Sequence, residues 1–369
     1  MNDPFLDLFL KKVRGLKTPQ PLEPPFTISL SPLPEPREEE VVGVDGGGGA
    51  ARVSGKSFRV ARAVAIGKGY LDREMELELS PWESSAALEA LRSSVELELT
   101  VRAPSTVLLD GSAYTPLSKW ITRVVRVARG RAKLSEIVAL PKTLEALYKL
   151  QSLGKKRVTF VSKSPMVKIF KEYTVLKRHP KLFERYVRGR LSPKELRDVA
   201  KRDLPELFDS TADADALKGE GVSFGLRLGL PEPLRNLIVP SRWKTVLEMA
   251  LENYKIYVGG EYSGPLPKDL CFLGAPVAWW VSYGRWKVMV EEFGEKPLCL
   301  ARYRERVEGV PRGLPALLAG SGSTYNVWLA LAHSLSTLRG EHLMEYLKLL
   351  SLETGLGLDE IREELIYVM

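Results

Sequence analysis

The sequence predicts an α/β fold with a mixed sheet flanked by helices, and two observations lead to this prediction. Short apolar runs rich in β-branched residues alternate with longer segments whose apolar residues recur at helical spacing. Two of the short runs, residues 41–45 and 106–110, end in an aspartate followed by glycine, and a capped helix is expected between them. Strands and helices that alternate in this order are typical of α/β sheets.

The composition limits the class of protein. The chain has 369 residues, which suffices for a large core in one elaborated domain or in two average ones. Its net charge of +8 creates a field that attracts polyanions such as nucleic acid. No apolar run approaches the roughly 20 residues that a membrane helix needs. Glutamine occurs only at Gln20 and Gln151 amid many charged residues, which favours a thermophilic source.

The cysteines and the first residues bear on location. Cys271 and Cys299 are the two cysteines, and without CxxC spacing they predict neither a thiolate metal site nor a disulfide framework. The first residues lack the cationic segment of a secretory leader. We therefore expect a cytoplasmic protein without membrane association.

Residues 1–40 are expected to precede the folded domain. Apolar residues at helical spacing make residues 4–16 an amphipathic helix, and a proline-rich connector follows over residues 18–40. The helix either docks on a partner or folds back onto its own domain. Residues 41–369 then form one folded domain.

The elements of this domain follow from periodicity and capping. The helix after the first three strands begins at a capping box that Ser80 opens, has proline at its first position and continues to about Arg102. Four glycines after Asp45 predict a loop. Strands are expected over residues 41–45, 51–53, 58–66, 106–109 and 157–161.

The second half of the chain is predicted more coarsely. Residues 165–208 are charged and helical in pattern, as in a basic insertion. Residues 220–310 alternate short strands with turn residues. Helices close the chain over residues 326–338, 342–352 and 358–366.

Asp45 and Asp110 suggest a site for divalent metal ions. Each follows an apolar run, and the glycine after it leaves room for a phosphate backbone. Hydrolysis of phosphodiesters by two Mg²⁺ or Mn²⁺ ions uses carboxylate oxygens as ligands. One Asp-Gly pair alone is typical of a hairpin turn, but two pairs that flank a capped helix favour metal binding.

Five features in order make the chain resemble the NurA nucleases, archaeal and bacterial enzymes that process DNA ends. They are Val44-Asp45-Gly46-Gly47, residues 95–100, residues 108–112, Tyr325 and Ala332-His333. The resemblance implies a ribonuclease H-like core and a metal-dependent deoxyribonuclease. Its activities would be 5′-to-3′ exonuclease on DNA and endonuclease on single strands.

The same resemblance implies cofactors and partners. Each site would hold two Mn²⁺ or Mg²⁺ ions, and the substrates would be double- and single-stranded DNA. The protein would be a homodimer with a central DNA channel. A HerA-type hexameric ATPase would feed DNA into it during resection of double-strand-break ends.

By position, the resemblance implies that Asp45, Glu96 and Asp110 hold the metal ions. It also implies that His333 is a further ligand or proton shuttle and that Tyr325 lies near the site. On the bare sequence, His333 lies in an apolar helix and is typical of a buried core histidine.

The residue that the helix contributes stays open between two glutamates. Helical periodicity puts Glu98 nearer than Glu96 to the apolar stripe of the helix, and Glu96 has the spacing to pair with Arg92. The chain also departs from the family pattern. Glycines occupy residues 46–49 where Ser or Thr is common, and Asn326 follows the tyrosine where the family often has proline.

Cationic residues near these motifs are expected to contact DNA. They are Lys163 at a strand end, Arg123 and Arg126 after the second aspartate, and Lys168 and Lys171 in the insertion. Such cations follow phosphates without regard to sequence, and aromatic residues between them stack on unpaired bases. The alternative interpretation is an ordinary solvated surface.

Two other functions compete with a nuclease. An ATPase like actin or the sugar kinases uses a related βββαβαβα core and a phosphate loop that begins Asp-x-Gly-Gly, although a second glycine-rich phosphate loop is not evident here. A non-catalytic DNA-binding subunit would use the basic insertion alone.

Overall fold

The structure is a computed structural model, and it describes residues 5–14, 26–153, 156–163, 167–187, 193–207, 211–230, 234, 239–271, 274–355 and 367–368. The start of the predicted connector, residues 18–25, and the helix predicted over residues 358–366 lie outside these ranges. Among the described residues, no helix combines the length and hydrophobicity that crossing a bilayer requires.

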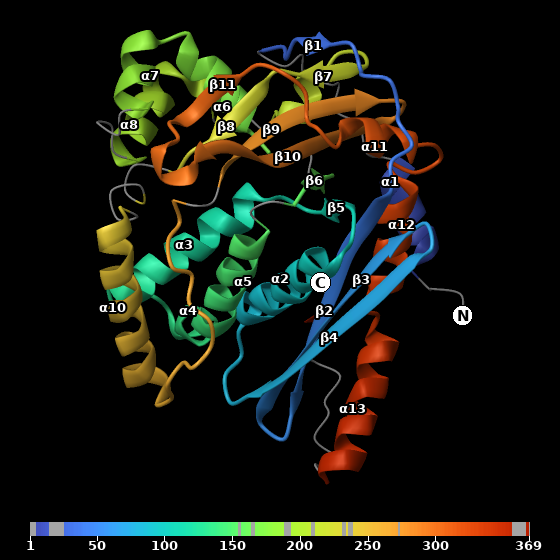
Figure 1. The fold of residues 1–369 in the computed structure, drawn as a ribbon, viewed down its shortest axis with the longest axis vertical. Coiled ribbons are helices and arrows are strands. Elements are labelled where there is room, and N and C mark those ends of the chain that lie inside the picture. The colour runs from blue at the N-terminus through green and yellow to red at the C-terminus, as the bar shows by residue number, and fades with distance from the viewer. Residues whose placement is uncertain are drawn as a thin grey trace.

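One mixed sheet organises the described chain (Figure 1). Its main strand order is β1-β7-β9-β10-β6-β5-β2-β3-β4, with β2, β5 and β6 parallel and the other pairs along this path antiparallel. The expected α/β class with a mixed sheet is confirmed. The strands are β1 (Leu30–Ser31), β2 (Val41–Val53), β3 (Lys56–Gly67), β4 (Tyr70–Ser80), β5 (Thr106–Asp110), β6 (Val158–Ser162), β7 (Gly221–Ser223), β8 (Gly225–Leu228), β9 (Gly274–Tyr283), β10 (Trp286–Pro297), β11 (Tyr303–Val307) and β12 (Tyr367–Val368).

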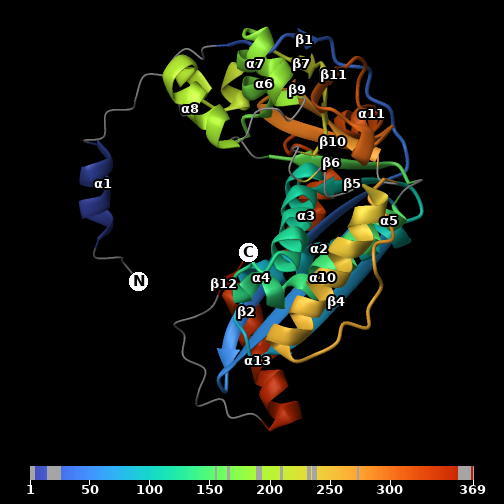
Figure 2. The same cartoon turned by 90° about the vertical axis from the view of Figure 1, so that its left-hand side faces the viewer.

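Helices lie on both faces of this sheet, and α1 lies apart from it (Figure 1 and Figure 2). They are α1 (Leu6–Arg14), α2 (Ser85–Arg102), α3 (Tyr114–Ala128), α4 (Leu134–Val138), α5 (Leu140–Ser152), α6 (Ile169–Lys177), α7 (Pro180–Val187), α8 (Pro193–Asp203), α10 (Pro240–Val258), α11 (Leu314–Ala319), α12 (Val327–Ser336) and α13 (Gly340–Thr354). Short 3₁₀ turns lie at η1 (Pro205–Leu207), η2 (Asp213–Ala216) and η3 (Leu298–Leu300).

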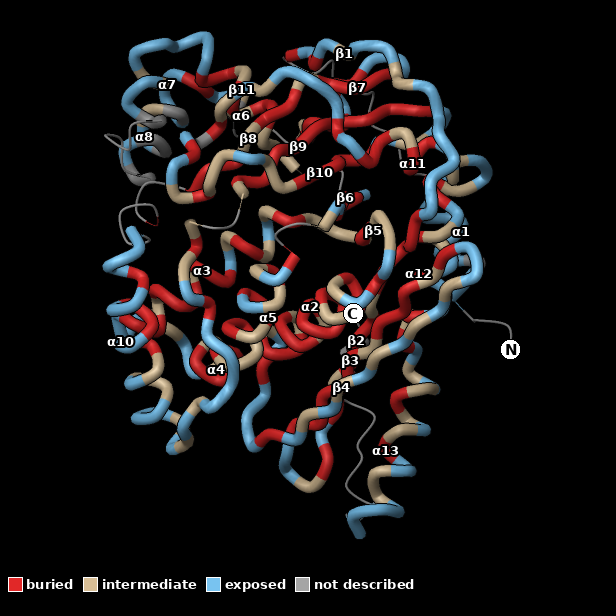
Figure 3. Tube along the Cα trace, viewed as in Figure 1, coloured by how far each residue is buried: buried red, intermediate tan, exposed pale blue. Residues whose placement is uncertain are grey.

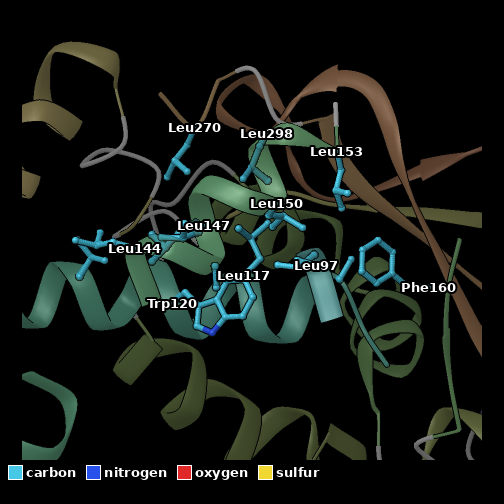
Figure 4. Packing of buried hydrophobic residues seen from close by; sticks show 14 of the residues in the cluster. Leu97, Leu117, Trp120, Leu144, Leu147, Leu150, Leu153, Phe160, Leu270 and Leu298 are labelled. Carbon is cyan, nitrogen blue, oxygen red and sulfur yellow. The ribbon is translucent and has the colours of Figure 1, made fainter. Parts of the chain in front are cut away.

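Both faces of the central strands are covered. Val107 and Leu109 of β5 belong to the core that α2, α3, α5 and α10 form, whereas Leu108 belongs to a second core with α11 and α12. This division follows from the alternation of side chains along a strand. Figure 4 shows the first core, where Leu117 and Trp120 of α3 meet the leucines of α5. In Figure 3 the buried stretches run along the strands and along parts of the helices, such as α2 and α10.

Strand β2 runs further than predicted. The expected strand end at Asp45 and the expected glycine loop are both wrong, because residues 46–49 continue in β2 and pair with β3. The physical reason is close packing. A Cβ atom on Gly43 would lie 2.5 Å from the Trp328 carbonyl carbon, and one on Gly47 would overlap the Ser336 carbonyl oxygen. The glycines therefore let α12 lie directly on the strand.

Two helices differ from the sequence prediction. The predicted start of α2 at Ser80 is wrong, since Ser80 ends β4 and Ser84 is the N-cap, where its hydroxyl accepts from the Ala87 N–H at 3.0 Å. The long helix α10 lies where short strands were expected. Its signals were Pro240 at the first position and buried residues at helical spacing, among them Trp243 and Leu247.

Cys271 and Cys299 form a disulfide, which corrects the prediction that the cysteines make no such bond. Their separation of 28 residues carries no signal in the sequence. They meet because β9 and β10 pair as antiparallel neighbours, which brings the segment before β9 next to the segment after β10.

Helix α1 exposes its apolar side chains. Phe5, Leu8, Phe9 and Val13 are all exposed, and Figure 2 shows α1 apart from the other elements.

Candidate metal centre

Asp45 lies in the middle of β2 with its side chain toward α12. Only 7% of the residue is exposed. Its Oδ2 lies 2.7 Å from Nδ1 of His333 and 3.4 Å from the Ser336 hydroxyl, which donates to it. Its Oδ1 accepts from the Gly46 N–H at 2.8 Å. One carboxylate thus joins β2 to two residues of α12.

Helix α12 is held in this place at its start. Asn326 is the N-cap, and its side-chain oxygen accepts from the N–H groups of Trp328 (3.0 Å) and Leu329 (3.2 Å). The departure from the family's proline therefore leaves the helix start intact. His333, two turns further, faces both Asp45 and solvent.

Asp110 ends β5, and Gly111 then turns the chain away with φ +122°, a conformation that favours glycine. Its Oδ2 accepts from the Tyr325 hydroxyl at 3.0 Å and forms an ion pair with Lys163 Nζ at 2.8 Å. Lys163 also donates to the Tyr325 hydroxyl at 3.0 Å. Burial, and then the charge of Asp110, raises the pKa of Tyr325, so the phenol keeps its proton as a donor.

The carboxylates of Asp45 and Asp110 and the imidazole of His333 converge. Ligand atoms of the three residues all lie within 4.8 Å of one another. Burial, and then repulsion from Asp110, raises the pKa of Asp45, whereas His333 lowers it. A divalent cation would relieve this repulsion, and carboxylate oxygens with an imidazole suit Mn²⁺ or Mg²⁺. The residues present therefore fit the expected ion.

Glu96 approaches from the opposite face of the sheet, over Gly46. A Cβ atom at Gly46 would lie 2.7 Å from both Cγ and Oε1 of Glu96, so the glycine opens the space that the carboxylate occupies. Burial raises the pKa of Glu96 to about 8; Arg92 lowers it, while Asp45 and Asp110 raise it further. A bound cation would favour the charged form.

The two glutamates of α2 have different surroundings. Glu98 pairs with Lys149 of α5 at 3.2 Å and points away from the aspartates. Glu96 faces Gly46, and it also makes the expected pair with Arg92, at 3.5 Å. The helical stripe marks the apolar packing face of α2, whereas the Glu96 side chain occupies the gap that Gly46 leaves.

The predicted DNA contacts separate into two groups. Lys163 lies at the centre itself, and Lys168 is the N-cap residue of α6 and is half-buried. Lys171 is a correction: it is fully buried, and its ammonium donates to the Thr211 carbonyl at 3.2 Å, so it cannot reach DNA.

The two arginines of α3 also differ from expectation. Arg123 is a correction, because it is buried and donates to the Thr143 hydroxyl at 2.6 Å. Burial lowers its pKa. Arg126 is partly exposed but pairs with Glu136 at 3.0 Å. It follows the start of α3 by about 18 Å along the axis, which separates it from the aspartates.

A cavity of about 280 Å³ opens beside Asp110 between α2 and α3. Arg92 and Lys119 line it together with Ser112, Glu96 and Asp110. The sequence named Arg92 only as a partner of Glu96 and missed Lys119, which reaches the same cavity because α2 and α3 both pack on α5.

The sequence also missed Glu291, which holds the loop after Asp110. This buried carboxylate of β10 accepts from the N–H groups of Ala113 and Tyr114 at the start of α3. Helix α3 has no side-chain cap of its own, so Glu291 supplies it from another strand. An acidic residue inside an apolar strand is the one signal that pointed to such a role.

Comparisons with known proteins yield similar structures. No protein-family model and no curated protein matches the sequence. The chain is similar to the NurA nuclease from Sulfolobus solfataricus, with 13% identity and a TM-score of 0.49 over 95% of each chain. It is also similar to NurA with manganese (13% identity, TM-score 0.49, 88% of this chain and 91% of that chain). A third similar structure is NurA bound to dAMP and manganese (13% identity, TM-score 0.46, 86% and 90%).

Proposed function

We propose that this protein is a metal-dependent DNA nuclease of the NurA type. The observation that carries the proposal is the meeting of Asp45, Asp110 and His333, whose ligand atoms lie within 4.8 Å although they come from three distant parts of the chain. Hydrolysis of phosphodiesters needs this kind of oxygen-rich cation site.

Each residue of the centre has a proposed role. Asp45, Asp110 and His333 would hold a divalent ion, and Glu96 would complete the ligand set over Gly46. A bound Mn²⁺ or Mg²⁺ supplies Lewis-acid activation of water and neutralises charge on the phosphate. Lys163 contacts the phosphate next to the scissile bond, since its ammonium is partly exposed beside Asp110.

Tyr325 orients Asp110 in this scheme. Its hydroxyl donates to the carboxylate, and its carbonyl in turn accepts from Tyr283 at 2.6 Å. The tyrosine is buried, so it fixes the aspartate and does not itself touch solvent.

The course of the glycine run favours a nuclease over an ATPase. Strands β2, β3, β4, helix α2, β5, a helical segment and β6 follow in a βββαβαβ order that suits a ribonuclease H-like core and an actin-like ATPase alike. An actin-like phosphate loop needs open backbone after its aspartate. Here residues 46–49 belong to β2 and pair with β3, and α12 and Glu96 cover them. This packing leaves no room for a nucleotide phosphate.

The finer parts of the proposal come from the family resemblance in the sequence. We infer two ions per site, 5′-to-3′ exonuclease activity on DNA, and endonuclease activity on single strands. We further infer a homodimer, a HerA-type hexameric ATPase as partner, and a role in end resection in the cytoplasm of a thermophile. A division into residues 1–40 and a nuclease domain over 41–369, with an insertion at about 165–208, belongs to the same proposal, except that β1 (Leu30–Ser31) already pairs with β7 in the sheet.

The test is cleavage of end-labelled linear DNA by purified protein with Mn²⁺, compared with EDTA. Asp45→Asn should abolish cleavage, because a neutral amide replaces the carboxylate that is proposed to bind the metal ion. Glu98→Gln is the matched control, since it changes an acid of the same helix as Glu96 that points away, and it should cleave normally. Full cleavage by a folded Asp45→Asn variant would overturn the proposal.

The same preparation separates the competing functions. Hydrolysis of ATP without DNA cleavage would favour the kinase-like alternative. DNA binding that falls with salt but ignores EDTA, with no cleavage product, would favour the non-catalytic subunit.

A further inference from the structure

Arg62 of β3 donates hydrogen bonds to the C-terminal end of α12, the helix that carries His333. Its Nε donates to the Ser336 carbonyl at 3.0 Å, and an amino group donates to the Thr337 carbonyl at 2.5 Å. Carbonyl groups at a helix C-terminus lack partners within the helix and carry partial negative charge. A guanidinium that donates to two of them is therefore a strong cap.

The place of Arg62 in the sheet explains why it reaches this end. Arg62 is paired with Gly47 in the register of β2 and β3, so the two positions share one face. The missing side chain of Gly47 lets the Ser336 carbonyl settle onto β2. The arginine next to it then closes over the carbonyl from the neighbouring strand.

The capped turn of α12 is the same turn that contacts Asp45. His333 and Ser336 both hydrogen-bond to Asp45 Oδ2, and the carbonyl of Ser336 is the group that Arg62 binds. Asn326 fixes the start of the same helix. The helix is thus held at both ends, and only the far end depends on a charged side chain from another element.

We propose that Arg62 is a positioning residue of the metal centre, which keeps the imidazole of His333 against Asp45 by capping α12. The inference rests on the proposed function, since it assumes that His333 is a ligand. Arg62 itself touches neither metal nor DNA in this scheme. Residues that orient a metal ligand in this way commonly change metal affinity when they are replaced.

The same guanidinium connects the centre to the C-terminal helix α13. It donates to the Tyr346 hydroxyl at 3.0 Å and lies 3.4 Å from Nδ1 of His342. Both residues belong to α13. Arg62 therefore joins β3, α12 and α13 at one point, and loss of the Tyr346 contact alone should leave its cap on α12 in place.

The test measures Mn²⁺ affinity by calorimetry on the full chain, which does not depend on nuclease activity. Arg62→Met should weaken Mn²⁺ binding on the order of tenfold. In a His333→Ala background the same change should have no further effect, because a residue that acts through His333 is silent once the imidazole is gone. Arg62→Lys should keep part of the affinity, since an ammonium still caps the helix.

Arg59→Met is the matched control for plain destabilisation. Arg59 is a buried arginine of the same strand that pairs with Glu78 at 2.7 Å and donates to the Trp82 carbonyl, on the face away from α12. Its replacement should lower the melting temperature in EDTA but leave the Mn²⁺ affinity of the folded protein unchanged. An equal loss of affinity in Arg59→Met would overturn the inference.

The remaining outcomes separate the inference from the function on which it rests. If His333→Ala alone leaves Mn²⁺ affinity unchanged, the proposed metal centre is wrong, and the proposed role of Arg62 is wrong with it. If His333→Ala weakens binding but Arg62→Met does not, only the role of Arg62 is wrong. That role is also wrong if Arg62→Met weakens Mn²⁺ binding by the same factor with and without His333.

Discussion

At the scale of single residues, the absence of a side chain at Gly46 matters as much as the carboxylates around it. Glu96 lies in a helix on one face of the sheet, and Asp45 and His333 lie on the other. Strand β2 lies between them, and a side chain at residue 46 would occupy the space of the Glu96 carboxylate. The position of this carboxylate therefore depends on glycine at residue 46.

Gly46→Ala should therefore damage the metal centre without unfolding the protein. The new Cβ would displace the carboxylate end of Glu96, a flexible side chain, so the fold adjusts cheaply while the ligand moves. We expect Mn²⁺ affinity to fall on the order of tenfold. Gly48→Ala is the control, because its Cβ would meet the Leu88 side chain and the Val60 carbonyl oxygen but no residue of the site. Equal affinities of the two variants would refute the role of Gly46.

Asp213 gives a second prediction at this scale, about pH. Its carboxylate accepts from the N–H groups of Phe170 and Lys171 at the start of α6, and burial raises its pKa from 3.8 to about 6. Folding thus favours the protonated form. The contribution of Asp213 to stability is complete below the unfolded value and is lost as pH rises through the folded value.

The expected loss is about 3 kcal/mol between pH 3.8 and about 6. Asp213→Asn does not titrate, so urea unfolding of wild type and variant should show the difference in free energy shrinking over this range. Asp215→Asn, an exposed neighbour in the same turn, serves as control. A difference that stays constant or grows with pH would contradict the prediction.

At the scale of elements, buried carboxylates that are distant in the sequence cap helices that have no side-chain cap of their own. Glu291 of β10 caps α3, and Asp213 of η2 caps α6. Glu292, which follows Glu291 in β10, accepts from the N–H groups of Arg312 and Gly313 just before α11. Glu291 and Glu292 are adjacent in β10 and therefore point to opposite faces. One strand thus anchors a helix on each side of the sheet.

Glu291→Ala should lower the free energy of unfolding by about 1–3 kcal/mol, because two buried N–H groups lose their acceptor. Glu291→Gln keeps an acceptor oxygen and should cost less. Urea unfolding measures both values. Since α3 follows the Asp110 loop, Glu291→Ala should also weaken Mn²⁺ binding, and an unchanged stability would show that water replaces the cap.

These elements mark what the sequence could and could not predict. Apolar periodicity gave β5, β6, α12 and α13 with small errors at their ends, because local sequence determines such elements. The cap at Ser84, the strand course of residues 46–49 and the cap by Glu291 were missed. Each depends on what packs there from elsewhere in the chain, which periodicity does not report.

At the scale of the whole molecule, the candidate ligands come from β2, β5 and α12, far apart in the sequence. Aspartates after apolar runs and a family pattern made them candidates in the sequence, although β2 continues past Asp45. The sequence could not tell that Glu98, Arg123 and Lys171 point elsewhere, since their surroundings exist only after folding.

Mn²⁺ should therefore stabilise the folded chain. An unfolded chain does not bring the ligands together, so at a hundredfold excess over the dissociation constant the ion should add about 2.7 kcal/mol. Thermal unfolding in Mn²⁺ and in EDTA measures this gain. Asp45→Asn should remove it and Glu98→Gln should keep it, whereas a gain of equal size in both variants would place the ion elsewhere.

The bond between Cys271 and Cys299 bears on how such experiments are prepared. It ties together the two ends of the β9–β10 hairpin, the same hairpin that supplies Glu291 and Glu292. Thiol reductants commonly added to nuclease buffers would open this covalent clasp and raise the freedom of the unfolded chain. Dithiothreitol is thus expected to lower the melting temperature of this protein, and its concentration should match between samples.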